Sequence, residues 1–560
     1  MNVAEYIAEQ LKKRVEHIFG YQGGAILKLV DSMVEAGMQY VQTYHEQAAA
    51  LAADAYARVT GGLGAAIATS GPGATNLVTG IANAYFDSIP VLFITGQDYT
   101  SSINGDKMAR QNGFQAVDVV GICRPITKYA KLIMTAEEVP FELEKALYMA
   151  FEGRPGPVLL DIPIDIQFKE IEVAAVPVFS PPITTGIQGD AVKSAADNVM
   201  RRLKAAKRPV ILAGGGIRLA NAINEFKDFA DRTAIPVVTT LNALDCYEKA
   251  HSFSGLYGNT SANLIINNAD VLLVLGSRLG LRQVSKFKND YTNASVIQVD
   301  IDPYEQNRGL DSEFFVHSHL KPFLAAINEL CCDQDPLASV SWLEAVRGWD
   351  EKYLANSRVN DDGVDPVALV ATLTSLCTDD AIFTSDVGQN QMWVGQGFHV
   401  KGEQRLLNSS GHGAMGFSLP AAIGAKIAAP GRQVIAFTGD GGLQMNIQEL
   451  LTLAHRRLGI KCVVFNNNTL GLMREVQGLY FGSRFYGSCE KDFICPDLKG
   501  LAGAYGLNYV SITDEKQVDN LASCLADSEP WIIDVKVGIN SKVINRYDEK
   551  HVFEQEKIGG

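Results

Sequence analysis

The chain has 560 residues, of which 47% are hydrophobic and 20% are charged. This composition supports large apolar cores and excludes a disordered or fibrous protein. The net charge of −14 argues against binding nucleic acid or anionic lipid through overall charge. The N-terminus lacks the apolar core of a signal peptide, and the apolar runs are far shorter than the roughly 20 residues of a membrane helix. We therefore expect a cytoplasmic protein that acts on small molecules.

Short apolar runs alternate with helical stretches along most of the chain. Such strands, each followed by a helix, indicate parallel sheets covered on both faces. The predicted strands are 65–68, 91–95, 158–162, 210–212, 237–238, 271–275, 296–299, 434–437, 462–465 and 531–535. Segments 174–189 and 332–365 have the composition of linkers. We expect α/β domains with doubly wound parallel sheets at 1–172, 190–335 and 365–540, and a C-terminal tail at 541–560.

Two strand ends in the third domain carry oxygen-bearing side chains. The predicted strand 433–437 leads into Thr438-Gly439-Asp440-Gly441-Gly442, and after a predicted helix at 446–457 the strand 461–465 ends in three asparagines. Asp440 and Asn467 then lie at one edge of a parallel sheet, where ligands of such sheets bind. Their oxygens, with a peptide carbonyl near Thr469, suit Mg²⁺. Gly439, Gly441 and Gly442 allow a diphosphate to approach closely. The alternative is an ordinary turn with Asp440 as helix cap.

These segments resemble a known family. GDGGLQMNIQELLTLAHRR (439–457) and NNNTLGLMREVQGLYF (466–481) are similar to the diphosphate-binding motif of thiamine-diphosphate (ThDP) enzymes, and most closely to the acetohydroxyacid synthase, or acetolactate synthase, branch. The resemblance extends over nearly the whole chain. It implies pyrimidine-binding, FAD-type middle and diphosphate-binding domains, with ThDP, Mg²⁺ and FAD as cofactors. It also implies a homodimer or homotetramer, because the family builds each site from the first domain of one subunit and the third domain of another.

In the first domain, YHEQAAALAADAYAR (44–58) resembles the segment whose glutamate contacts the aminopyrimidine ring of ThDP. That role falls on Glu46, whose carboxyl would favour the imino tautomer that takes the proton from the thiazolium carbon. Taken alone, Glu46 reads as a solvated helix cap. The resemblance also assigns Gly23, Gly24, Pro72 and Asn76 to cofactor binding. It puts Phe114 and Gln115 near the reacting carbon, although plain core packing remains open for Phe114.

Two further segments of the third domain match the family. Gly388, Gln389 and Asn390 lie in VGQNQMW (387–393), which resembles a diphosphate-binding segment with asparagine in place of histidine. Gly413 and Met415 lie in GHGAMGFSLP (411–420), which resembles the segment that contacts the pyrimidine and holds ThDP folded. A methionine in such a loop is otherwise a core filler.

The middle domain resembles the FAD-binding domain of the family. A strand followed by three glycines is by itself a weak nucleotide signal. The resemblance assigns FAD binding to Gly214, Gly215, Gly216, Thr239, Leu241, Gly258, Arg278 and Asp300. Two departures stand against it: 278–282 reads RLGLR where the family often has RFDDR, and 317–319 reads HSH where it often has GDV. We expect a structural rather than a redox flavin.

The implied reaction is decarboxylation of pyruvate and transfer of the two-carbon unit to a carbonyl acceptor. Arg282 matches an acceptor-pocket arginine of the family, but Val476 stands where the family has tryptophan, near Met473. Losing an indole wall predicts a roomier pocket and a bulky ketone such as a keto-sugar nucleotide. The alternatives are an ordinary synthase that uses a second 2-keto acid, a flavin-linked pyruvate oxidase, and a non-enzymatic ThDP-sensing or scaffold protein.

Overall fold

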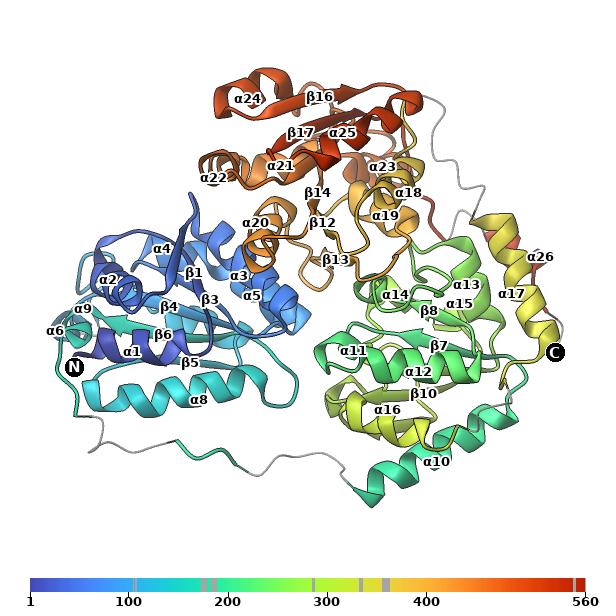
Figure 1. Cartoon of the computed structure of the whole chain (residues 1–560), viewed down its shortest axis with the longest axis horizontal. Coiled ribbons are helices and arrows are strands. Elements are labelled where there is room, and N and C mark those ends of the chain that lie inside the picture. Colours follow the sequence, from blue (N-terminus) through green and yellow to red (C-terminus); the bar gives the residue numbers. More distant parts are fainter. Residues whose placement is uncertain are drawn as a thin grey trace.

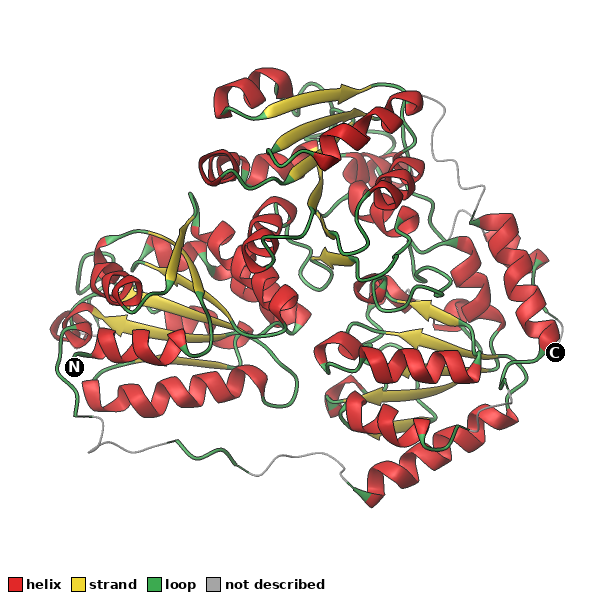
Figure 2. Ribbon diagram, in the orientation of Figure 1, coloured by secondary structure: helices red, strands yellow, loops and turns green. Residues whose placement is uncertain are grey.

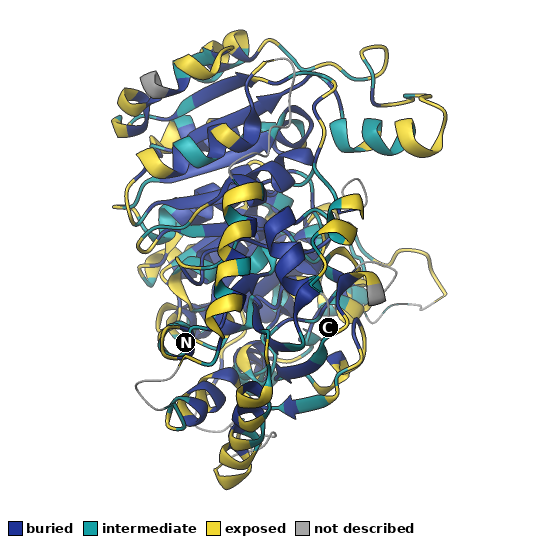
Figure 3. Ribbon diagram, turned by 90° about the vertical axis from the view of Figure 1, so that its right-hand side faces the viewer, coloured by how far each residue is buried: buried dark blue, intermediate teal, exposed yellow. Residues whose placement is uncertain are grey.

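The computed structural model describes residues 1–560 except 104, 106–107, 173–178, 183–188, 285–287, 332–335, 355–362, 547–549 and 559–560. It contains three parallel sheets, each flanked by helices (Figures 1 and 2). The expected α/β architecture with three doubly wound parallel sheets is confirmed. The strands are largely buried and the outer faces of the covering helices are exposed (Figure 3).

The N-terminal sheet has the strand order β2-β1-β3-β4-β6-β5, with every neighbouring pair parallel. Its strands are β1 (His17–Tyr21), β2 (Gln39–Gln42), β3 (Gly64–Ala68), β4 (Val91–Gln97), β5 (Tyr129–Leu132) and β6 (Val158–Pro163). Its helices are α1 (Val3–Lys12), α2 (Leu27–Glu35), α3 (Glu46–Thr60), α4 (Pro72–Asn76), α5 (Val78–Asp87), α6 (Thr100–Ile103), α7 (Val119–Cys123), α8 (Val139–Phe151) and α9 (Ile164–Gln167).

The middle sheet has the order β11-β10-β9-β7-β8 and is also parallel. Its strands are β7 (Pro209–Ala213), β8 (Val237–Thr239), β9 (Val271–Leu275), β10 (Ser295–Asp300) and β11 (Phe314–His317). The helices of this region are α10 (Asp190–Ala205), α11 (Gly216–Leu219), α12 (Ile223–Thr233), α13 (Thr260–Asn268), α14 (Leu281–Val284), α15 (Lys288–Tyr291), α16 (Leu320–Asn328) and α17 (Val340–Tyr353).

The C-terminal sheet has the order β13-β12-β14-β15-β17-β16, again parallel. Its strands are β12 (Ile382–Ser385), β13 (Arg405–Asn408), β14 (Val434–Gly439), β15 (Lys461–Asn466), β16 (Asn508–Ile512) and β17 (Trp531–Lys536). The helices are α18 (Pro366–Leu376), α19 (Gln389–Gly397), α20 (Ser418–Ala428), α21 (Asp440–Met445), α22 (Leu450–Arg456), α23 (Gly471–Tyr480), α24 (Leu498–Tyr505), α25 (Leu521–Ala526) and α26 (Lys550–Gln555).

The helix predicted at 446–457 differs from the observed structure. Helix α21 begins at Asp440, directly after β14, and the predicted segment is helical in two parts, a 3-10 turn at Ile447–Glu449 and α22 from Leu450. Asn446 separates α21 from this turn with φ −136°, outside the helical region. The side-chain amide of Asn446 donates to the carbonyl of Gly416 at 2.8 Å, so a tertiary hydrogen bond accompanies the break. The apolar spacing alone does not reveal it.

Helices α3 and α20 form the main contact between the N- and C-terminal domains, at the centre of Figure 1. The contact requires small residues. A Cβ atom on Gly424 would lie 2.0 Å from the carbonyl oxygen of Ala52. The alanine-rich sequence of α3 is therefore explained by the close approach of two helix backbones.

The second expected linker is only partly a connector. Residues 332–335 and 355–362 lie outside the described residues, as do 173–178 and 183–188 of the first linker. Helix α17 lies between residues 335 and 355, and its Trp342, Val346 and Trp349 are buried against the middle domain. The segment expected as the second linker therefore contains a helix at 340–353 that packs on the middle domain.

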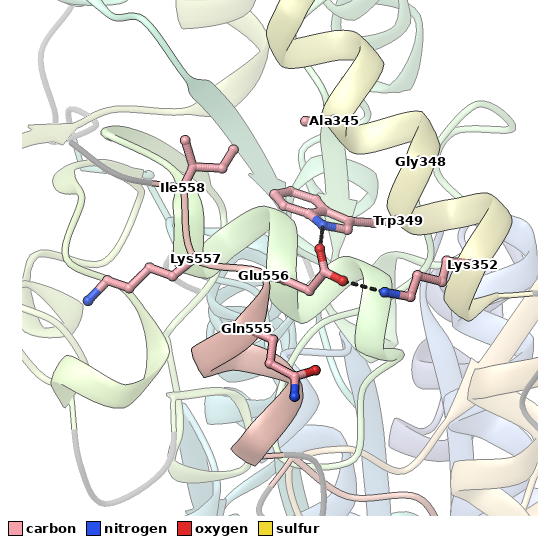
Figure 4. Close-up of a pocket in the computed structure, with 8 residues that line it drawn as sticks. All are labelled: Ala345, Gly348, Trp349, Lys352, Gln555, Glu556, Lys557 and Ile558. Atoms are coloured by element: carbon pink, nitrogen blue, oxygen red, sulfur yellow. Dashed lines mark hydrogen bonds and ion pairs between the residues drawn. The ribbon is translucent and has the colours of Figure 1, made fainter.

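The C-terminal tail crosses back to α17. The carboxylate of Glu556 accepts hydrogen bonds from the indole of Trp349 at 3.0 Å and the hydroxyl of Tyr353 at 2.8 Å, and it pairs with Lys352. Figure 4 shows Trp349 and Lys352 reaching Glu556 beside an open cavity of about 470 Å³. No helix in the described part of the chain has the length and apolar character needed to cross a membrane.

Candidate active site

The candidate metal site lies where the C-terminal sheet changes direction. In the order β13-β12-β14-β15, β13 is added on one side of β12 and β14 on the other, so the strand order reverses between β12 and β14. Ligands of parallel sheets bind in the crevice at such a point. Gly388 follows β12 with φ +128°, and Asp440 follows β14. Register pairs Gly439 with Phe465, so Asp440 and Asn467 both lie just past that edge.

Asp440 is the carboxylate of this edge, and it does not cap the helix. The N-cap of α21 is Gly439, so the helix-cap alternative is wrong. Asp440 is 3% exposed, its Oδ1 accepts the N–H of Gly441 at 2.8 Å, and its buried Oδ2 has no hydrogen-bond partner among the described residues. Burial raises the pKa of Asp440 to about 7, against backbone hydrogen bonds that lower it. A buried oxygen without a partner is costly unless a cation satisfies it.

Asn467 and Thr469 stand beside Asp440. The amide of Asn467 donates to Oε1 of Gln389 at 3.0 Å, and its Oδ1 accepts the N–H of Thr469 at a long 3.3 Å. The hydroxyl of Thr469 donates to the carbonyl of Ser488. The oxygen that Thr469 can offer to a cation is therefore its own backbone carbonyl. No group of three or more His, Cys, Asp or Glu side chains suited to a metal occurs in the described residues. One carboxylate, one amide and a carbonyl suit Mg²⁺ completed by other oxygens.

The glycines of 439–442 allow three segments to converge. A Cβ atom on Gly442 would lie 2.8 Å from Cγ of Asp386, and one on Gly439 would lie 3.2 Å from the amide nitrogen of Asn390. A Cβ atom on Gly441 would lie 3.6 Å from the methyl group of Met415. The structure thus brings together the three segments that the sequence assigned to the cofactor. Gly413 has φ +71° and open space at its Cβ position.

Asn390 and Gln389 differ in how their polar atoms are used. The Oδ1 of Asn390 is buried and without a partner in the described part of the chain, so it remains available to a ligand. Gln389 is already bonded: its amide donates to the carbonyl of Ser541 at 2.7 Å and to Glu475, and it accepts from Asn467. Gln389 therefore links α19 to α23 and to the tail rather than presenting a free group.

Sequence reasoning missed two buried carboxylates near these segments. Asp386 follows β12 and accepts the N–H groups of Gly416 at 2.9 Å and Ser418 at 3.1 Å, and burial raises its pKa to about 6. Glu449 accepts the N–H of Tyr44 at 2.8 Å, and burial raises its pKa to about 7. An acid directly after a strand was the available signal for Asp386, but β12 was not predicted.

The N-terminal edge gathers the residues assigned to the pyrimidine. Glu46 is the first residue of α3 and is 6% exposed, while the side chain of His45 caps the helix by accepting the N–H of Gln47 at 3.1 Å. The solvated-cap alternative for Glu46 is therefore wrong. Asn76 donates to Oε2 of Glu46 at 2.9 Å, and a Cβ atom on Gly73 would lie 3.1 Å from Oε1.

Neighbouring turns complete this edge. Gly24 has open space at its Cβ position, whereas a Cβ atom on Gly23 would lie 2.5 Å from Thr69, directly after β3. Pro72 begins α4, and Gln115 packs beside Gly71 with φ +59°. Phe114 is 83% exposed, so the core-packing alternative is wrong for this side chain. An exposed aromatic ring of this size is typical of a surface that contacts another group.

Within one chain, Glu46 and Met415 belong to opposite ends of α3. Arg58, near the far end of this helix, donates to the carbonyl of Asn408 at 3.1 Å and lies over the ring of Phe417. Arg58 comes twelve positions after Glu46 along the helix, which is a rise of about 18 Å at about 1.5 Å per residue. Asn408 and Phe417, which flank the loop that carries Gly413 and Met415, therefore lie at the Arg58 end of α3 and not at its Glu46 end.

The residues assigned to FAD meet at one edge of the middle sheet. Gly214–216 follow β7 and Gly276 follows β9, on either side of the point where this sheet reverses. A Cβ atom on Gly214 would lie 2.2 Å from the carbonyl oxygen of Gly276, and one on Gly216 would lie 2.8 Å from Cα of Gly276. A Cβ atom on Gly215 would lie 3.1 Å from Cβ of Asn242. Close packing of turns thus accounts for this glycine run without a nucleotide.

The other residues assigned to FAD have partners in the chain. Thr239 donates to the carbonyl of Ser252 at 3.1 Å, and Arg278 donates to the carbonyl of Phe86 at 3.3 Å. Asp300 accepts the N–H of Asp302 at 3.0 Å, and burial raises its pKa to about 6. A Cβ atom on Gly258 would lie 2.6 Å from the carbonyl of Phe253, and Leu241 lies against Gly395 of the C-terminal domain.

Comparison with known proteins agrees with this arrangement. The N-terminal and C-terminal TPP binding domains and the central domain of thiamine pyrophosphate enzymes match residues 1–122, 386–535 and 196–327. The "Acetolactate synthase large subunit" of Lactococcus lactis subsp. lactis (strain IL1403) is 36% identical, over 97% of this chain and 93% of that protein. The chain belongs to the acetolactate synthase-like family of ThDP enzymes.

Other relatives give the same assignment. The "Probable acetolactate synthase large subunit" of Methanococcus aeolicus is 35% identical, over 97% of this chain and 93% of that protein. The "Acetolactate synthase isozyme 2 large subunit" of Escherichia coli (strain K12) is 34% identical, over 96% of each. The resemblance stated from the motifs is confirmed. The protein is a ThDP-dependent enzyme of the type that joins carbon units, so the non-enzymatic alternative falls.

In this ThDP enzyme the expected acceptor residues lie on two elements. The guanidinium of Arg282, in α14, lies 3.3 Å from Oε1 of Gln391 and over the ring of Tyr257, and no ion pair joins it to a carboxylate of the described residues. Val476 and Met473 lie on α23, which has no fully buried residue. The guanidinium of Arg282 is thus a positive charge that can bind an anionic ligand, and the side chains of Val476 and Met473 are apolar.

Proposed function

We propose that this enzyme decarboxylates pyruvate and transfers the two-carbon unit to a second 2-keto acid. The observation that carries the proposal is the buried Oδ2 of Asp440, which lacks a partner among the described residues and stands beside Asn467 at the sheet's switch point. The relatives that span nearly the whole chain are named acetolactate synthases, which favours a 2-keto acid over a bulky ketone as acceptor. The preference for a bulky ketone, drawn from Val476 alone, has no support in these names.

Each end of the site has its own task. Asp440, Asn467 and a carbonyl near Thr469 would hold Mg²⁺, and with it the diphosphate, against the glycines of 439–442. Met415, whose methyl group faces Gly441, would keep the cofactor folded. Glu46 would exchange a proton with the aminopyrimidine, and its bond to Asn76 fixes the carboxyl for that exchange. When bound, ThDP supplies the nucleophile and the electron sink for decarboxylation.

The complete site needs a second copy of the chain. Glu46 and the segment around Met415 lie at opposite ends of α3 in one chain, about 18 Å apart along the helix. A single chain therefore does not bring Glu46 to the ring that Gly413 would contact. We infer at least a homodimer in which the N-terminal edge of one copy faces the C-terminal edge of another. The exposed ring of Phe114 would be covered in that contact.

The acceptor proposal rests on Arg282. Its guanidinium lies beside Gln391 and Tyr257, and no carboxylate in the described part of the chain neutralises it. An arginine in this state binds a carboxylate of the substrate as a two-pronged donor. A 2-keto acid offers that carboxylate next to the reacting carbonyl, whereas a keto-sugar nucleotide carries its negative charge far from it.

FAD remains a proposal for the middle domain. The switch point between β7 and β9 is a place where nucleotides bind, and Asp300 lies at the same edge. The close packing of Gly214 and Gly216 on Gly276 weighs against reading these glycines as a phosphate cradle. Flavin released by denaturing the purified protein, one per chain, supports the proposal, and a colourless protein that turns over pyruvate refutes it.

Product analysis tests the reaction. Mass spectrometry of mixtures with pyruvate alone, pyruvate with 2-ketobutyrate, and pyruvate with a keto-sugar nucleotide identifies the acceptor. We expect joined products in the first two mixtures. A product only with the sugar nucleotide contradicts the acceptor proposal. Peroxide formed in place of a joined product supports the pyruvate oxidase alternative.

A further inference from the structure

The segment 408–418, which carries Gly413 and Met415, is held by two buried carboxylates from different domains. Asp386, from the same domain, accepts the N–H groups of Gly416 at 2.9 Å and Ser418 at 3.1 Å. Asp87, the last residue of α5 in the N-terminal domain, holds the other end. The N-terminal domain, which carries Glu46, therefore also contacts the segment 408–418 of the same chain.

The side-chain carboxylate of Asp87 binds backbone N–H groups of the segment 408–418. The N–H of Gly411 donates to Oδ1 at 2.8 Å and that of Ser410 donates to Oδ2 at 3.1 Å. The Asp87 side chain is 2% exposed, so water does not compete for these bonds. Hydrogen bonds to a charged, buried acceptor are among the stronger ones in proteins.

Arg58 keeps the Asp87 carboxylate in place. Its Nη2 lies 3.1 Å from Oδ2 of Asp87, and its Nε donates to Asp54 at 2.6 Å. The same guanidinium donates to the carbonyl of Asn408, so it holds both the carboxylate and the start of the segment. The position of residues 408–411 is thus set by buried charges of α3 and α5.

Gly411 allows the segment to approach Asp87 closely. A Cβ atom on Gly411 would lie 2.8 Å from the carbonyl oxygen of Phe86 and 2.9 Å from Oδ1 of Asp87. Only glycine lets the backbone come this close without displacing a neighbour. Between the two grips, Met415 is half-buried with its methyl group toward Gly441.

We propose that Asp87 is a positioning residue for Met415: it fixes, from the N-terminal domain, the loop on which the folded shape of the bound cofactor depends. The proposal rests on the proposed function, because it takes Met415 as the cofactor wedge. Misplacing such a group by about 1 Å lowers turnover by up to about 100-fold. Asp87 touches neither substrate nor cofactor, so its effect passes through the segment.

The test compares Asp87→Asn with Asp245→Asn. Asp245 is a matched control, because it is equally buried, pairs with Arg218 and Arg405, and accepts the N–H of Leu406, outside the loop at 409–417. Asparagine at position 87 turns an NH₂ group toward one of the N–H donors of the segment. We expect kcat for pyruvate to fall about tenfold or more, with KM for pyruvate nearly unchanged and an altered near-UV circular dichroism of bound ThDP. The control should keep kcat within about twofold.

A double-mutant cycle with Met415→Ala separates positioning from general stability. If Asp87 acts through Met415, Asp87→Asn costs little in the Met415→Ala background. The same loss of kcat in both backgrounds, or an equal loss in Asp245→Asn, overturns the proposal. Should Asp87→Asn fail to fold, Gly411→Ala disturbs the same grip without removing a charge and is expected to lower kcat in the same way; an unchanged kcat there overturns the proposal. An unmodified protein that binds no ThDP would instead refute the proposed function.

Discussion

The N-terminal and C-terminal domains share one topology and carry different chemistry. Renumbered from the first strand of each sheet, both have the order 2-1-3-4-6-5 with all strands parallel. Where the third strand ends, the N-terminal domain reads Thr69-Ser70-Gly71-Pro72-Gly73 and the C-terminal domain reads Thr438-Gly439-Asp440-Gly441-Gly442. Only the second of these turns provides a carboxylate. The fold supplies the edge, and a few residues on it decide which half of the cofactor it serves.

The difference continues in the helix after the second strand. In the N-terminal domain this helix is α3, which begins with the buried Glu46, and in the C-terminal domain it is α20, which begins with Ser418. The two helices pack against each other across the domain contact. One domain is thus equipped for proton transfer and the other for holding a cation, and neither is complete alone.

The largest expected effect breaks the proton-transfer side. Glu46→Gln keeps the size of the side chain and removes its exchangeable proton, so we expect pyruvate turnover to fall about 10²- to 10⁴-fold while ThDP stays bound. Steady-state carbon dioxide release and cofactor retention after gel filtration measure the two. Glu16→Gln, an exposed position of the same domain, is the control and should keep its activity. Turnover close to that of the control refutes the role of Glu46.

A mixed dimer of two inactive variants tests whether Glu46 and Asp440 of one site come from different copies of the chain. If each site combines the N-terminal edge of one copy with the C-terminal edge of another, a mixed dimer of Glu46→Gln and Asp440→Ala has one site with both changes and one intact site. Co-expressed with two different tags and purified through both, it should regain about half of the activity per dimer. No recovery in such a dimer contradicts a site shared between copies.

A smaller effect is expected at the acceptor pocket. Val476→Trp restores the large aromatic side chain of the family on α23, so it should reduce the use of the larger 2-keto acid acceptor, 2-ketobutyrate, by about tenfold and affect pyruvate as acceptor less. Competition between two acceptors in one mixture gives the ratio directly. The conservative change Val476→Ile serves as control, and equal loss for large and small acceptors shows that volume at this position does not select the acceptor.

The smallest effect concerns the contact between the two domains. Burial raises the pKa of Glu449 from its ordinary value of about 4.5 to about 7. The folded state therefore holds this proton more tightly than the unfolded chain. The associated stability is fully present below about pH 4.5 and is lost as pH rises through about 7, for a total of about 3 kcal/mol.

Glu449→Gln removes this titration and keeps an oxygen for the N–H of Tyr44. The midpoint temperature of thermal unfolding is measured for both proteins. The difference, wild type minus variant, should decrease as the pH is raised from 5 to 8. A difference that stays constant over this range shows that Glu449 does not change its protonation there.

Much of the fold and part of the site were predictable from the sequence. All ten predicted strands occur, because each is a short and mostly apolar run, and the turns of Asp440 and Asn467 follow two of them. Seven strands of the described residues were not predicted, among them β12, whose sequence Ile-Phe-Thr-Ser is half polar. Asp386 was missed with it, because its partners come from a segment 30 residues later. The grip of Asp87 on Gly411 joins residues 324 positions apart. Such long-range pairs arise from packing and leave no local pattern.

The most direct measurement is the binding of ThDP to the wild type and to Asp440→Ala, each titrated with and without Mg²⁺ and followed by calorimetry. We expect tight, Mg²⁺-dependent binding by the wild type and weak, Mg²⁺-independent binding by the variant. Equal binding by both proteins, or wild-type binding that ignores Mg²⁺, would contradict a cation held by Asp440 and Asn467 at the edge of the C-terminal sheet.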